Sequence, residues 1–139
     1  GLAEFRASTM IPVAVGESEC TRFDFAALVA ARAVDILQPD PAFCGGITEA
    51  MRIAALASSF NLRLAPHLWA GAPCFFAGLH VLAAAPAGFI VEFSLGANPM
   101  IHTLSRAPVV VQDGTIAVPD GPGLGLDMDT EMIARYAKS

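Results

Sequence analysis

The chain has 139 residues, a length that suits one domain, and its 13 acidic and 8 basic residues give a formal net charge of −5. Hydrophobic residues make up 55% of the chain and charged residues 15%, which excludes a disordered protein and indicates extensive burial. The basic residues form no cluster that could neutralise phosphates, so nucleic acid is excluded as a partner.

The longest segment without charge, residues 64–91, could be mistaken for a membrane span. A spanning helix needs about 20 continuous apolar residues, and prolines and glycines interrupt this segment. The interruptions are Pro66, Gly71, Pro73, Gly78, Pro86 and Gly88. We therefore expect no membrane span, and instead a strand, a helix and a second strand covered by protein on both faces.

The chain contains three cysteines, Cys20, Cys44 and Cys74, and their odd number and wide spacing suit neither a disulfide framework nor a zinc knuckle. We interpret them as structural thiols in a reducing compartment. Residues 1–10 lack the apolar core of a secretory signal, so a cytoplasmic location is expected.

Short apolar runs alternate with helical patterns along most of the chain. The expected strands are residues 11–15, 34–38, 62–66 and 89–91, and the expected helices are residues 23–33, 48–60 and 73–85, with Thr48 capping the second helix. This alternation predicts an α/β fold with parallel strands and right-handed crossovers. Residues 109–118, centred on Asp113-Gly114, predict a hairpin, and residues 130–137 predict a last helix.

Four ionisable residues lie at or just past the end of the predicted strands, namely Glu17, Asp40, His67 and Glu92. They are separated by 23, 27 and 25 residues, about the length of one strand, one helix and two short loops. Each residue should therefore lie at the same level. In a parallel barrel the carboxyl ends of the strands form the active-site face, so the four side chains are predicted to converge on one pocket.

Each of these residues also has a structural interpretation. Glu17 could cap the following helix, and Asp40 could be a turn residue before a proline. His67 could be a hydrogen-bonded core histidine. Glu92 ends an apolar strand, where a carboxylate must be paired, hydrated or bound to metal. The common spacing of all four favours a site over these separate explanations.

Several segments resemble the C-terminal part of the mandelate racemase and muconate lactonizing enzyme family within the enolase superfamily. They are IPVAVGES (11–18), VDILQPD (34–40), GGITEAMRIAALA (45–57), APHLW (65–69), VEF (91–93) and VPDGPGLGLD (118–127). The resemblance implies that residues 1–139 form the C-terminal half of a (β/α)7β TIM-type barrel. It comprises strands 5 to 8 of the barrel, with residues 109–139 as a C-terminal extension. The capping domain and the first half of the barrel have no counterpart in this sequence.

The family resemblance also implies roles for the residues at the strand ends. Glu17 matches one of three ligands of a Mg2+ cofactor that chelates a carboxylate substrate. Asp40 and His67 match a dyad in which the imidazole moves protons and the aspartate orients it. Glu92 matches the acid that hydrogen-bonds the substrate carboxylate as charge develops there. Trp69, two residues past His67, is a candidate to cover the substrate.

Two positions depart from the family pattern, because Ser18 stands where Asn is common and Pro41 where a small aliphatic residue is usual. The family's lysine base and its first two metal ligands have no match here.

The first functional hypothesis is a Mg2+-dependent acid-sugar dehydratase that forms an enolate and then eliminates the β-hydroxyl. A racemase or epimerase of a 2-hydroxy acid would use the same dyad, and a non-catalytic fragment is the third hypothesis. The family implies a homo-oligomer in the intact protein, and we expect this chain alone to be inactive.

Overall fold

A short parallel sheet forms the centre of the protein, which is described here from a computed structural model covering residues 1–137. Its strands are β1 (Ala14–Val15), β2 (Ile36–Leu37) and β3 (Arg63–Leu64), in the order β1-β2-β3. Both pairings are parallel, as the alternation of strands and helices predicts. The prediction of consecutive parallel strands is therefore confirmed for these three.

The fourth predicted strand, residues 89–91, does not form a regular strand. Gly88 makes a single parallel bridge with Leu64, and the Phe89 amide donates to the Leu64 carbonyl at 2.9 Å. Within residues 1–137 this segment pairs on one side alone, and a strand with one neighbour has fewer ladder bonds to fix it. Predicted strand 11–15 also has one neighbour within the described residues, and its regular pairing is limited to β1, residues 14–15. Ile11 is 76% exposed there and not buried as predicted.

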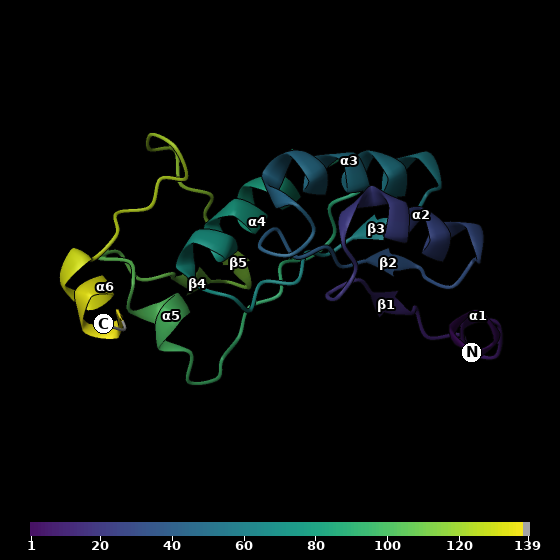
Figure 1. Ribbon diagram of the computed structural model, residues 1–139, viewed down its shortest axis with the longest axis horizontal. Helices are drawn as coiled ribbons and strands as arrows, with labels where there is room; N and C mark the ends of the chain where they lie inside the picture. Colours follow the sequence, from purple (N-terminus) through teal and green to yellow (C-terminus); the bar gives the residue numbers. More distant parts are fainter. Residues whose placement is uncertain (138–139) are drawn as a thin grey trace.

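Helices cover the sheet on the side seen at the top of Figure 1. They are α2 (Thr21–Ala30) and α3 (Gly46–Ser59), which follow β1 and β2 respectively. The core between these helices and the sheet includes Phe25, Leu37 and Ile53, all fully buried. Burying large apolar side chains is the main stabilising contribution here.

The start of α3 differs from the prediction. The helix begins at Gly46 and Thr48 lies inside its first turn, so Thr48 does not cap it. Gly45 is the N-cap residue, and its φ of 113° lies in the region that favours glycine. Two successive glycines therefore set the start of the helix, where a Thr cap was expected.

Helix α4 (Ala72–Ala84) follows β3 and begins with Pro73 in its first turn, as predicted. It packs against the C-terminal part of the chain through Phe75, Phe76 and Leu79. That part contains α5 (Pro99–His102), the predicted hairpin of β4 (Val111–Gln112) and β5 (Thr115–Ile116), and α6 (Thr130–Tyr136). It lies at the opposite end of the molecule from α1 (Leu2–Ala7) (Figure 1). Within residues 1–137, every helix is too short or too polar to cross a bilayer.

Candidate functional site

The register of the sheet places three predicted site residues at one level. Val15 is paired with Leu37, and Leu37 with Leu64. Glu17 follows the end of β1 by two residues, and Asp40 and His67 follow the ends of β2 and β3 by three. Pairing continues past the strands, because the His67 amide donates to the Pro39 carbonyl at 3.2 Å. The backbone itself therefore brings His67 beside Asp40.

Asp40 and His67 form a direct side-chain pair. His67 Nδ1 lies 2.9 Å from Asp40 Oδ2, and Asp40 is only 6% exposed. An ionised carboxylate can only accept a hydrogen bond, so Nδ1 carries the proton and donates it. The arrangement fixes the ring, and Nε2 is the nitrogen that remains to exchange a proton with a ligand.

Glu17 lies on the other side of the His67 ring. Its Oε2 is 3.4 Å from His67 Nε2, and its side chain is 67% exposed. Glu17 does not cap α2, because the first amides of the helix bond elsewhere: that of Thr21 to the Cys44 carbonyl at 3.1 Å and that of Arg22 to Glu49 Oε1 at 2.9 Å. The carboxylate of Glu17 is thus exposed to solvent beside the His67 ring.

Glu92 lies beside the segment that carries His67, although its predicted strand is irregular. Its Oε2 accepts a hydrogen bond from the Leu68 amide at 3.3 Å. Trp69 is 52% exposed, and its carbonyl accepts a hydrogen bond from Asn98 Nδ2 at 2.9 Å. The indole of Trp69 is thus exposed two residues after His67 in sequence.

The structural interpretations of two of these residues hold in part. Asp40 does form a turn, since its Oδ1 accepts a hydrogen bond from the Ala42 amide at 2.7 Å. The same carboxylate uses its second oxygen for His67, so the turn and the pair coexist. His67 is satisfied by hydrogen bonding, but its ring is 21% exposed and bonds to a carboxylate rather than to core groups.

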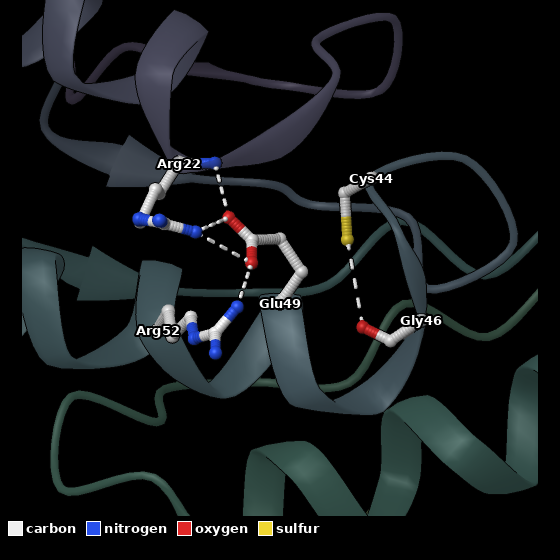
Figure 2. A network of polar contacts seen from close by, with 5 residues as sticks. All are labelled: Arg22, Cys44, Gly46, Glu49 and Arg52. Carbon is white, nitrogen blue, oxygen red and sulfur yellow. Dashed lines mark hydrogen bonds and ion pairs between the residues drawn. The ribbon is translucent and has the colours of Figure 1, made fainter.

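An acidic residue that the sequence did not single out, Glu49, accepts hydrogen bonds from Arg22 and Arg52 (Figure 2). Glu49 is 6% exposed and accepts hydrogen bonds from the Arg22 amide and guanidinium and from the Arg52 guanidinium. These bonds, that of the Arg22 amide foremost, lower the pKa of Glu49 to about 2. Since Arg22 lies in the first turn of α2 and Glu49 in the first turn of α3, the cluster ties together the starts of the helices that follow the Glu17 and Asp40 loops.

Two of the three thiols are buried, and the third is exposed. Cys44 and Cys74 lie in the interior, whereas Cys20 is exposed and so is not the buried thiol expected from sequence. Burial, with Asp40 nearby, raises the pKa of Cys44 to about 11 and that of Cys74 to about 12. Cys74 Sγ lies 3.1 Å from Asp40 Oδ1. Both buried thiols therefore stay protonated at neutral pH.

A cavity of about 600 Å3 lies at the opposite ends of the strands, away from the dyad. Arg6 and Asp35 line it and form an ion pair at 2.6 Å. The hydrogen bond from Arg6 lowers the pKa of Asp35. Ligands of parallel α/β sheets bind at the carboxyl ends of the strands, so we assign the site to the dyad end.

The donor chemistry at the dyad end fits part of a magnesium site. Mg2+ prefers carboxylate oxygens, and the exposed Glu17 carboxylate offers one. Within residues 1–137, no group of three His, Cys, Asp or Glu side chains could hold a metal ion. Glu17 can therefore act as one ligand of such an ion, and the described residues do not complete its coordination.

Comparison with known proteins assigns the chain to a family. Residues 1–132 match the family model described as "Enolase C-terminal domain-like". The chain belongs to this family. The domain that defines it is an α/β barrel, in agreement with the parallel strands and covering helices of this chain.

Curated relatives of this enolase-family chain act on sugar acids or their lactones, according to their names. The chain is 36% identical to D-galactarolactone cycloisomerase from Agrobacterium fabrum, over 96% of the chain and 38% of the relative. It is 34% identical to D-galactonate dehydratase from Ralstonia pickettii, over 98% of the chain and 37% of the relative. The chain thus spans somewhat more than a third of the length of these relatives.

Solved structures show the same fold for the enolase-family chain. A mandelate racemase/muconate lactonizing enzyme-like protein from Rubrobacter xylanophilus matches with a TM-score of 0.88 and 39% identity, over 99% of this chain and 35% of that one. The mandelate racemase/muconate lactonizing enzyme from Sulfitobacter sp. matches with a TM-score of 0.87 and 38% identity, over 96% and 33%. The resemblance to this group of enolase-superfamily proteins is thereby confirmed.

Proposed function

We propose that the natural polypeptide carrying this chain is a Mg2+-dependent acid-sugar dehydratase of the mandelate racemase type. The observation that supports it best is the buried Asp40 bonded to His67 at 2.9 Å, at the carboxyl ends of parallel strands. Relatives named as a D-galactonate dehydratase and a D-galactarolactone cycloisomerase favour a sugar-acid substrate. Residues 1–139 would form barrel strands 5 to 8, with residues 109–139 as a C-terminal extension, in a cytoplasmic homo-oligomer.

In this proposal each side chain at the strand ends has a separate task. Glu17 would be one ligand of Mg2+, which supplies positive charge to the substrate carboxylate when bound. Glu92 would hydrogen-bond the same carboxylate as negative charge grows on it. Trp69 would cover the substrate and exclude water. The lysine base and two further acidic ligands would come from residues outside this sequence.

His67 and Asp40 carry the proton transfers of the second half-reaction. After the proton beside the carboxylate is removed, the electron pair left on that carbon forms a double bond to the neighbouring carbon. The bond from that carbon to the β-hydroxyl breaks, and the His67 ring, protonated on both nitrogens, gives its Nε2 proton to the departing oxygen to form water. The enol that remains tautomerises to the 2-keto-3-deoxy acid. Asp40 holds Nδ1 and stabilises the protonated ring before the transfer, which keeps the ring in one orientation.

The test is a panel of acid sugars incubated with the full natural polypeptide and Mg2+ in D2O and followed by 1H NMR. A dehydratase yields a 2-keto-3-deoxy acid and water. Loss of the α-proton signal with an unchanged carbon skeleton and formation of the epimer would instead establish the racemase reaction. If no member of the panel changes while the protein binds Mg2+, the proposed chemistry is wrong and the chain serves a non-catalytic role.

A further inference from the structure

The carboxylate of Asp40 is held by more than its partner in the dyad. Its Oδ2 faces His67 Nδ1 at 2.9 Å. Its Oδ1 accepts the Ala42 amide at 2.7 Å and lies 3.1 Å from the Cys74 sulfur. Both oxygens are therefore bonded, and the plane of the carboxylate is fixed from two directions.

Cys74 reaches Asp40 from the neighbouring structural unit. It lies in the first turn of α4, seven residues after His67, and is 9% exposed. β3 and α4 thus supply both the imidazole and the thiol, while the loop after β2 supplies the carboxylate between them. This placement lets one strand–helix unit orient the aspartate of the preceding unit.

A thiol suits this position for an electrostatic reason. It is a weak neutral donor, and a thiol that stays protonated can only donate to the carboxylate. A lysine or arginine would hold Asp40 equally well but would cancel its negative charge. That charge is what stabilises a protonated His67 ring. A neutral donor therefore orients Asp40 and leaves its charge for the imidazole.

We propose that Cys74 is a positioning residue of the dyad, whose S–H group holds Asp40 Oδ1 so that Oδ2 stays aligned with His67 Nδ1. The inference rests on the proposed role of Asp40 and His67 in catalysis. It assigns no chemical step to Cys74, which would touch neither substrate nor metal. Cys74 acts through Asp40 alone.

The test compares Cys74→Ser, which keeps a donor, with Cys74→Val, which keeps an apolar side chain and removes the donor. In the full natural polypeptide we expect Cys74→Val to lower kcat about tenfold, the typical effect of one hydrogen bond to a charged group. KM should stay within about twofold. Cys74→Ser should keep at least half of the wild-type kcat. Cys74→Ala provides the same comparison if Cys74→Val does not fold.

A second readout does not depend on turnover. In 15N-histidine-labelled protein with Mg2+ added, the Nδ1–H signal of His67 should be retained in Cys74→Ser and lost or shifted upfield in Cys74→Val. Equal kcat and equal ring signals in wild type and Cys74→Val would overturn the inference. So would an equal loss in Cys74→Ser and Cys74→Val, since packing and not the donor would then matter. If the wild type turns over no acid sugar, the proposed function fails and the ring signal alone still decides the role of Cys74.

Discussion

Gly16 connects the sheet to the site, and its replacement by alanine should be costly. Gly16 has a φ of 144° and immediately precedes Glu17. A Cβ at this position would lie 2.6 Å from Phe25 Cε1 and 2.9 Å from the backbone nitrogen and carbon of Gln38. Phe25 is fully buried, and the Gln38 amide is bonded to the Val15 carbonyl at 2.9 Å. The clash can therefore be relieved only by moving the backbone or the core.

The expected loss follows from these two effects. A non-glycine residue in a sparsely populated φ region costs about 1–3 kcal/mol. Overpacking a closed part of the core costs about 1–3 kcal/mol more. Gly16→Ala should therefore lower the free energy of unfolding by about 2–6 kcal/mol. The shift needed to accommodate the methyl group would also displace Glu17 from His67.

Gly114 provides a matched control, because its φ is 73° but a Cβ there would meet no atom within 4 Å. Gly114→Ala should cost about 1 kcal/mol from backbone strain alone. Urea unfolding of the full natural polypeptide, followed by circular dichroism, measures both variants against the wild type. If Gly16→Ala is no more destabilising than Gly114→Ala, the close approach between β1, α2 and β2 does not have the consequence argued here.

Three further predictions concern the buried polar groups and the metal. Because the pKa of Glu49 falls from 4.5 to about 2 on folding, its stabilising contribution should be complete above about pH 5 and lost as the pH falls toward 2; Glu49→Gln should flatten that part of an acid unfolding curve. Iodoacetamide at pH 8, read by peptide mass spectrometry, should label exposed Cys20 and leave Cys44 and Cys74 unmodified until denaturant is added. Calorimetric titration of the isolated chain with Mg2+ should show weak binding, since Glu17 offers one carboxylate; micromolar affinity at a single site would contradict this.

Much of the fold could be predicted because the chain repeats a simple pattern. Apolar runs of strand length alternate with helical periodicity, which predicted the order of the elements, the parallel pairing and the hairpin around Asp113. The pattern does not say how many neighbours a strand has. Residues 89–91 look like a buried strand in sequence, yet pairing there is limited to the Phe89 amide bond to Leu64, beside the single bridge between Gly88 and Leu64. The number of neighbours of a strand depends on the whole sheet. Limited pairing accounts both for the irregular backbone of residues 89–91 and for the exposure of Ile11.

The sequence predicted at which end of the sheet the candidate site lies, but it did not predict the contacts that support the site residues. Equal spacing was enough to bring His67 beside Asp40, because each repeat returns the chain to the same edge. Cys74 and Glu49 gave no such signal. A cysteine in an apolar helix resembles core, and an acidic residue in the first turn of a helix resembles a surface group. Their partners lie 34 and 27 residues away, and only the packing of neighbouring loops brings them together.

The central claim is that His67, oriented by Asp40, transfers the proton that completes dehydration. It is tested most directly by comparing wild type with His67→Asn in the full natural polypeptide, using an acid sugar on which the wild type is active. The account predicts that His67→Asn forms no 2-keto-3-deoxy acid while its Mg2+ affinity, measured by calorimetry, stays within about threefold of the wild-type value. A His67→Asn variant that retains most of the wild-type turnover would contradict it.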